Sequence, residues 1–148
     1  MSKQVINPPE LFDSVQFGFS QIVVSPPGGR LVHMSGQVAW DERRAIVGRG
    51  DLRAQVMQSL RNVETGLRLA GGTLADIVAL RIYIKYSHMG ESGAVREGLQ
   101  HFFGAEPPCA TWIGVPGLAN EEFLVEIEPI AVVHERSAGQ ASGLPVVS

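Results

Sequence analysis

An apolar stripe at helical spacing, followed at once by a segment of alternating residues, restricts the fold of this chain more than any other feature. Between residues 52 and 70 the apolar side chains recur every three or four positions, as they do along one face of a helix. Between residues 76 and 85 large apolar residues occupy every second position, as they do in a strand with one buried face. Each of these apolar faces needs a covering layer, so this order predicts a helix packed on a sheet.

The predicted helix has recognisable ends, because Asp51 is suited to cap its first turn and Gly71-Gly72 to end it. Its apolar stripe consists of Leu52, Val56, Leu60, Val63, Leu67 and Ala70. In the strand that follows, the face expected beneath a helix consists of Val78, Leu80, Ile82 and Ile84. The opposite face consists of Ile77, Ala79, Arg81, Tyr83 and Lys85.

The remaining periodic segments complete an α+β pattern. Two β-rich runs, 21–24 and 31–38, flank a Pro- and Gly-rich stretch and predict a hairpin. A second helical stripe begins at Val95 and ends at Gly104, and strands are predicted over residues 110–115 and 123–133. This order predicts a mixed sheet with two helices packed on one face.

A sheet covered on one side leaves its other face for function. We expect that face to carry Arg81 and Tyr83 from one strand and, from the last strand, Glu126 and Glu128. Two carboxylates at alternate positions of an otherwise apolar strand need partners or raised pKa values if they are buried. We therefore look for the functional site on this open face.

Composition limits the classes of protein that remain. The 148 residues suit one domain, placed at 1–136, and the Ser-, Gly- and Ala-rich stretch 137–148 is expected to be disordered. Only 18% of residues are charged, below the roughly 25% of typical domains, which favours an oligomer interface. The lone Cys109 favours a cytoplasmic location over a disulfide scaffold. A secretory signal and a membrane helix are not expected, and a net charge of −3 disfavours nucleic acid as a partner.

Several segments, taken together and in order, resemble the Rid (YjgF, or L-PSP endoribonuclease-like) family. The matching segments are Phe19-Ser20-Gln21, Ser35-Gly36-Gln37, Gln58-Ser59-Leu60-Arg61-Asn62-Val63, Ala70-Gly71-Gly72, Asp76-Ile77-Val78, Pro108 with Thr111, Gly114-Val115 and Val125-Glu126-Ile127-Glu128-Pro129-Ile130-Ala131-Val132. The resemblance implies a chorismate-mutase-like fold and a homotrimer with a central β-barrel. It also implies small-molecule clefts between the subunits.

The resemblance further implies hydrolysis of small enamines and imines, with release of ammonia. Carried over residue by residue, the Glu that orients the attacking water is Glu126, the backbone contacts are Ser35 and Gly36, and the pocket Tyr is replaced by Phe19. Family members clamp the substrate carboxylate with an Arg in a Pro-x-Arg-[Ser/Thr] segment. With these residues and the open face, the expected ligand-binding set is Phe19, Ser35, Gly36, Arg81, Tyr83, Ala110, Thr111 and Trp112.

The carboxylate clamp itself is missing from this sequence. The segment here is Pro108-Cys109-Ala110-Thr111, so Ala110 replaces the Arg, and Trp112 occupies a pocket position that is often Cys. A desolvated carboxylate without a cation loses about 2 to 5 kcal/mol of binding free energy. Two alternatives follow: Arg81 supplies the cation from the neighbouring strand, or the ligand lacks a carboxylate and stacks on Trp112 and Phe19.

Other reactive residues have simpler interpretations. Cys109 has no identifiable activating neighbour and is expected to be an inert thiol, and His33 is expected to be a packed strand residue. The spacing of the four His residues predicts no metal site, and no cofactor is expected.

Three functions are consistent with this sequence. The first is an enamine or imine hydrolase of altered specificity that uses Glu126. The second is a non-catalytic trimer that binds a small metabolite or regulates a partner. The third is an endoribonuclease or translation inhibitor, which the net charge disfavours.

Overall fold

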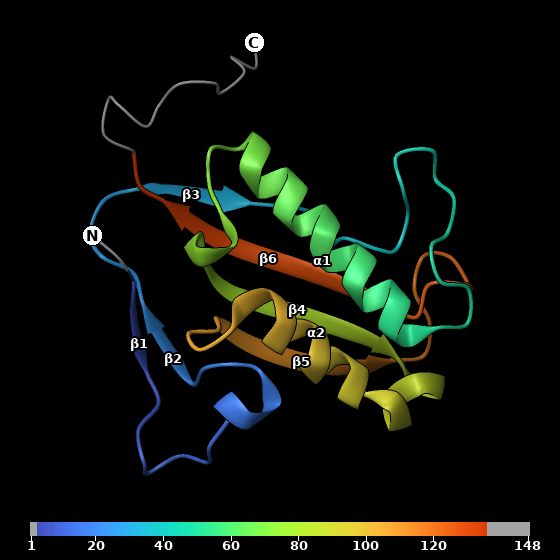
Figure 1. The fold of residues 1–148 in the computed structure, drawn as a ribbon, viewed down its shortest axis with the longest axis horizontal. Coiled ribbons are helices and arrows are strands. Elements are labelled where there is room, and N and C mark those ends of the chain that lie inside the picture. Colours follow the sequence, from blue (N-terminus) through green and yellow to red (C-terminus); the bar gives the residue numbers. More distant parts are fainter. Residues whose placement is uncertain (1–2, 136–148) are drawn as a thin grey trace.

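The computed structural model describes residues 3–135, so the expected tail at 137–148 lies outside the described residues. Within these residues, two helices and six strands form the fold, arranged as Figure 1 shows. In chain order they are β1 (Gln4–Ile6), β2 (Ile22–Val24), β3 (Arg30–His33), α1 (Leu52–Leu69), β4 (Ile77–Lys85), α2 (Gly93–Phe103), β5 (Cys109–Val115) and β6 (Val125–Val133). Short 3-10 turns, η1 (Val15–Phe17), η2 (Leu74–Asp76) and η3 (Tyr86–Glu91), connect some of them.

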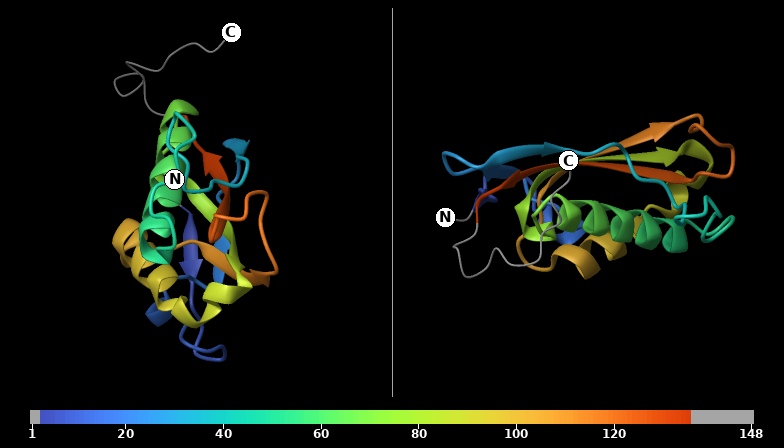
Figure 2. Two further views of the ribbon diagram at one scale, coloured as in Figure 1. Left: turned by 90° about the vertical axis from the view of Figure 1, so that its right-hand side faces the viewer. Right: turned by 90° about the horizontal axis from the view of Figure 1, so that it is seen from above.

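A four-stranded sheet in the order β3-β6-β4-β5 forms the centre of the molecule. β4 and β5 are parallel, whereas β6 runs antiparallel to both β3 and β4. Figure 2 shows α1 and α2 side by side on one face of this sheet, and residues 3–135 place no helix on the other face. The predicted α+β layer arrangement is confirmed.

Helix α1 forms where the apolar stripe predicts it. Its N-terminus is capped by Asp51, whose carboxylate accepts a hydrogen bond from the backbone N–H of Ala54 at 3.1 Å. Its end is formed by Gly71 in the left-handed conformation and by a backbone hydrogen bond of 2.8 Å from Gly72 to Leu67. The stripe from Leu52 to Leu67 is buried against the sheet, which places the apolar core between the helices and β4 and β6.

Strand β4 departs from simple alternation at its first residues. Its pairing with β6 shifts between Ile77 and Ala79, so one residue is extra at this point. As a result Ile77 is fully buried and Val78 only half-buried, the reverse of their predicted faces. From Leu80 onward the predicted faces are correct, with Leu80, Ile82 and Ile84 in the core.

The predicted hairpin between residues 21–24 and 31–38 is wrong. β2 pairs instead with β1 in a separate two-stranded sheet, and β3 pairs with β6 in the main sheet. The Pro- and Gly-rich stretch between them therefore carries the chain from one sheet to the other. Gly29 is required in it, because its φ is +89° and a Cβ there would lie 2.9 Å from Cγ1 of Val132.

Within residues 3–135, no helix combines the length and the apolar character needed to cross a membrane.

Candidate functional site

The open face of the sheet carries two cross-strand pairs in its middle. Arg81 on β4 lies directly opposite Glu128 on β6, and Tyr83 lies directly opposite Glu126. The Arg81 Nη1 and Glu128 Oε1 atoms are 3.6 Å apart. Alternation along both strands predicts that these residues share one face, and the observed register places all four side chains on the face without helices.

A bulge after β3 brings a backbone segment against Glu126. His33 pairs with Ile130 and Gln37 bridges to Ile127, so three residues, Met34 to Gly36, oppose two on β6. Backbone hydrogen bonds of 2.8 and 3.0 Å between Gln37 and Ile127 hold the segment after the bulge.

Gly36 is packed against the Glu126 side chain. A Cβ on Gly36 would lie 2.7 Å from Cγ and 2.9 Å from Cδ of Glu126, closer than atoms in ordinary contact. Its neighbour Ser35 is exposed, and the Ser35 carbonyl accepts a hydrogen bond of 2.9 Å from Nε2 of Gln37. The glycine therefore sets where the half-buried carboxylate of Glu126 lies.

Glu126 and Gly36 also line a cavity of about 840 Å³ that extends toward helix α1. Trp40 forms one wall and packs edge-on against Phe123, with ring centroids 4.9 Å apart. Arg61 and Asn62 line it from α1. The cavity thus combines a carboxylate, an aromatic wall and a guanidinium.

Asn62 holds the loop that carries the aromatic wall. Its Nδ2 donates hydrogen bonds to the carbonyls of Val38 at 2.9 Å and Trp40 at 2.8 Å, and Gln58 donates to its Oδ1 at 2.9 Å. Sequence reasoning missed Trp40, Arg61 and Asn62 as cavity residues. The spacing of Gln58 and Asn62, one helical turn apart on the polar face of α1, is the signal that marks this face.

The other expected ligand-binding residues lie at the β5 edge of the sheet. Ala110 pairs with Leu80 and Trp112 with Ile82, so both project to the helix side, where they pack against the core. Phe19 lies beside Trp112, with ring centroids 6.1 Å apart. Thr111 is exposed on the opposite side and pairs with Arg81.

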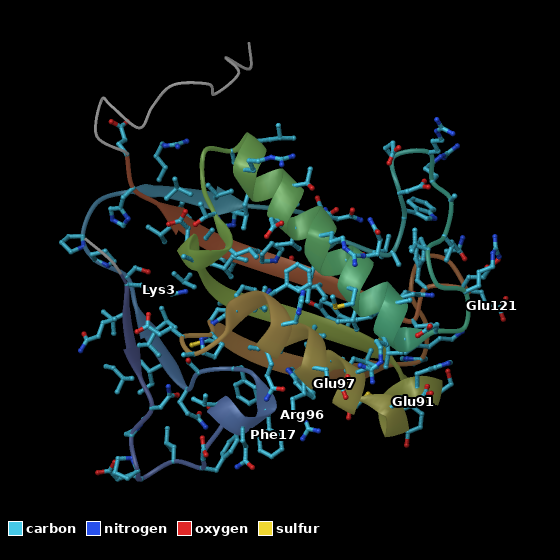
Figure 3. All side chains as sticks on the ribbon, in the orientation of Figure 1. Lys3, Phe17, Glu91, Arg96, Glu97 and Glu121 are labelled. Atoms are coloured by element: carbon cyan, nitrogen blue, oxygen red, sulfur yellow. The ribbon has the colours of Figure 1, made fainter. Side chains whose placement is uncertain are left out.

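Aromatic residues extend the Phe19–Trp112 contact toward the surface. Phe12 packs edge-on against both Phe19 and Phe17, and both Phe12 and Phe17 are exposed. Figure 3 shows Phe17 in the N-terminal segment near α2. Nε1 of Trp112 is buried and has no hydrogen-bond acceptor among the described residues.

The expected site residues therefore form two groups within one chain. Glu126, Gly36, Tyr83, Arg81 and Thr111 occupy the open face or its rim, whereas the second group, Phe19, Ala110 and Trp112, lies at the far edge on the helix side. Successive residues of a strand point to opposite faces, so the sheet itself separates the two groups.

The remaining candidates have ordinary surroundings. Burial raises the pKa of the Cys109 thiol, whose Sγ lies 3.5 Å from the carbonyl of Gln21. His33 is exposed on the open face. Among residues 3–135, no group of three or more His, Cys, Asp or Glu side chains is arranged to hold a metal ion.

A second cavity, of about 620 Å³, lies away from Glu126 and includes Phe102, Phe103 and Glu106 in its lining. Lys3 also lines it, where its Nζ donates a hydrogen bond of 2.7 Å to the carbonyl of Ile77. Burial is the main reason why the pKa of Lys3 is lowered, and the nearby carboxylates of Asp76 and Glu106 oppose that shift. None of the expected site residues lines this cavity.

Comparison with known proteins assigns the family. A sequence model described as Endoribonuclease L-PSP matches residues 14–133. The chain therefore belongs to this family, which is also known as the Rid or YjgF family.

Individual relatives agree with this assignment. A Rid family protein of unknown function, YyfB from Yersinia pestis, is 41% identical, with a TM-score of 0.84 over 90% of this chain and 100% of that one. A member of the YjgF/YER057c/UK114 family from Mycobacterium tuberculosis is 29% identical, with a TM-score of 0.61 over 89% of this chain and 100% of that one. A RutC family protein from Pyrococcus horikoshii is 29% identical over 70% of this chain and 79% of its own length.

Proposed function

We propose that this protein hydrolyses small enamines or imines and that Glu126 is its catalytic residue. The observation that carries the proposal is the position of Glu126: a half-buried carboxylate on the open face, opposite Tyr83 and fixed by contact with Gly36, at the wall of a cavity. Family membership supports the assignment of this carboxylate to the attacking water.

The chemistry needs a group that takes a proton from water while the water oxygen attacks the imine carbon. The Glu126 carboxylate accepts that proton and returns it to nitrogen, which gives the carbinolamine. It then carries the hydroxyl proton to the same nitrogen, so the C–N bond breaks and ammonia and a carbonyl compound are released. General acid–base catalysis of this kind contributes about 10² to 10⁴ in rate. Tyr83, directly across the strands, offers an aromatic surface beside the reacting group.

A homotrimer completes the cleft in this proposal. The open face carries uncovered apolar side chains, among them Leu31, which is 59% exposed. A second copy placed on this face covers such residues and brings its own Phe19, Ala110 and Trp112 toward Glu126. The same proposal places the protein in the cytoplasm, where such reactive metabolites form.

Ammonia release from freshly generated imines tests the activity. The panel contains 2-iminopropanoate, which carries a carboxylate, and uncharged imines that do not. We expect the wild type to accelerate at least one of them and Glu126→Ala to lose about 10²-fold or more of that acceleration. Equal release by both proteins across the panel contradicts the assignment.

A second candidate function is a non-catalytic trimer that binds a small metabolite or regulates a partner. Ala110 favours it, because the family's carboxylate-binding Arg is replaced there. A ligand that binds in the wild type, without turnover of any imine, is the result expected from such a binding protein. Endoribonuclease activity remains the least favoured function, since a net charge of −3 opposes binding to a phosphate backbone.

A further inference from the structure

The carboxylate of Glu126 has no cationic partner in the described part of the chain. Ion pairs form between Arg49 and Glu122, Arg53 and Glu97, and Arg81 and Glu128, and Nε2 of His88 lies 3.7 Å from Oε2 of Glu91. Within residues 3–135, none of these pairs includes Glu126. A half-buried carboxylate without a cation favours a ligand that supplies one.

The two cations of β4 on the same face both have partners: Nζ of Lys85 donates a hydrogen bond of 2.8 Å to the carbonyl of Glu121, and Arg81 has a carboxylate beside it. Arg81 faces Glu128 across the strands at 3.6 Å, so the two charges compensate one another. Because its charge is already compensated by Glu128, Arg81 is a weak binding partner for a ligand carboxylate. The family's own clamp position is also neutral, because it is occupied by Ala110.

The cavity beyond Glu126 carries more acid than base. Its lining includes the carboxylates of Asp41, Glu42 and Glu126 and one guanidinium, that of Arg61. Asp41 is turned to its own loop, where it accepts hydrogen bonds of 2.9 Å from the backbone of Arg43 and Ala45. An anionic ligand is opposed by this excess of negative charge, and a cationic ligand is favoured.

Aromatic surfaces next to the carboxylate suit a cation with an apolar body. Tyr83 pairs with Glu126 across the strands and its side chain is on the same face, so a cation bound between the two side chains gains cation–π attraction in addition to its charge pair. Trp40, packed on Phe123, offers an apolar wall farther into the cavity.

We infer that the substrate is a protonated imine, an iminium ion, that carries an aromatic or aliphatic body and no carboxylate. This inference rests on the proposed function, since it names the substrate class of the same site. Water adds to the iminium carbon, and one of its protons passes by way of Glu126 to nitrogen. The C–N bond then breaks, and the remaining hydroxyl proton passes to the departing ammonia as the carbonyl forms. The reaction balances as R₂C=NH₂⁺ + H₂O → R₂C=O + NH₄⁺, with no oxidant or reductant.

A matched pair of imines tests this selectivity. A flavin amine oxidase acting on 2-phenylethylamine releases an imine without a carboxylate, and an amino acid oxidase acting on phenylalanine releases the same skeleton with one. We expect the wild type to accelerate hydrolysis of the first about tenfold more than the second, because like charges in the cleft oppose the carboxylate. We expect Ala110→Arg to reverse that preference, since in the proposed trimer the neighbouring copy then brings a bidentate cation to the cleft.

Binding provides a readout that does not depend on turnover. Calorimetric titration of the wild type with 2-phenylethylammonium, phenylalanine and 3-phenylpropanoate should show the tightest binding for the first. Glu126→Gln should weaken binding of 2-phenylethylammonium about tenfold, by removing the charge and keeping the shape. Glu121→Gln, which removes one negative charge from the loop before β6 (Figure 3), should leave this affinity unchanged.

The outcomes separate this inference from the proposed function. Preference for the phenylalanine-derived imine, or tighter binding of 3-phenylpropanoate, overturns the inference. Loss of that preference in Arg81→Ala would then identify Arg81 as the clamp. Failure to accelerate either imine, with 2-phenylethylammonium still bound most tightly, overturns the proposed hydrolase and supports the cation-selective cleft.

Discussion

Replacement of Gly36 by Ala should impair activity without unfolding the protein. The added methyl group would lie 2.7 Å from Cγ and 3.2 Å from Oε1 of Glu126, and ordinary contact begins at 3.4 Å. The Glu126 side chain must therefore shift by about 0.7 Å or change rotamer. Misplacement of a catalytic group by about 1 Å costs on the order of 10²-fold in rate. We expect Gly36→Ala to lower kcat for imine hydrolysis by about 10²-fold.

Stability should change little in this variant. Gly36 does not have a positive φ, so Ala fits its backbone, and the clash involves a side chain that can move. We expect a change of at most about 1 kcal/mol in the free energy of unfolding, measured with urea. Gly90→Ala is the matched control, because a Cβ at Gly90 meets nothing within 4 Å.

A double-mutant cycle isolates the contact between the two residues. Glu126→Ala removes Cγ and every atom beyond it, and with them the clash, so Gly36→Ala should cost far less of the residual activity in the Glu126→Ala background than in the wild type. Activity of Gly36→Ala within twofold of Gly90→Ala would refute the claim that Gly36 sets the position of this carboxylate.

Three further predictions concern stability, the thiol and assembly. Gln55→Leu should lower the free energy of unfolding by about 3 kcal/mol in urea titrations. The buried Gln55 amide donates hydrogen bonds to the carbonyls of Gly48 and Glu122 and accepts one from the N–H of Leu124, and Leu can replace none of them. An unchanged unfolding midpoint would count against this prediction. Burial raises the pKa of Cys109 in the folded state, so the unfolded chain loses the thiol proton at a lower pH than the folded chain. The free energy of unfolding of the wild type, measured with urea, should therefore fall relative to that of Cys109→Ala as the pH rises above about 9. Parallel pH profiles of the two proteins would contradict this. In sedimentation equilibrium the wild type should have a mass three times the 15.9 kDa of one chain. Ile130→Glu, which places a charge on the open face, should have the mass of one chain. A variant that remains trimeric would exclude this face as the interface.

The layer arrangement follows from the sequence because period and burial agree along most of the chain. The stripe from Leu52 to Leu67 and the alternation from Leu80 to Ile84 each face the core as their spacing predicts. The presence of Arg81, Tyr83, Glu126 and Glu128 on one face follows from the same alternation. These features depend on local spacing, which is visible in one sequence.

Features that depend on pairing between distant segments could not be predicted from the sequence. A loop with Pro26 and Pro27 suits a hairpin as well as a crossing between sheets, and only the partner strands β1 and β6 decide between them. The bulges at Val78 and at Met34 to Gly36 are likewise set by the strand opposite.

The cavity beside Glu126 could not be predicted from the sequence pattern either. Trp40 and Arg61 come from a loop and a helix that meet only because Asn62 binds the loop backbone. The separation of Ala110 and Trp112 from Glu126 has a similar origin. It depends on which face each strand presents once β4, β5 and β6 are in register.

The central claim is that Glu126 acts on an imine in the cleft at the open face. The most direct test is the rate of ammonia release from the imine of 2-phenylethylamine, measured with wild type and Glu126→Gln at equal concentration. The proposed mechanism predicts acceleration by the wild type and a loss of about 10²-fold or more in the variant. Acceleration that is the same in both proteins would contradict it.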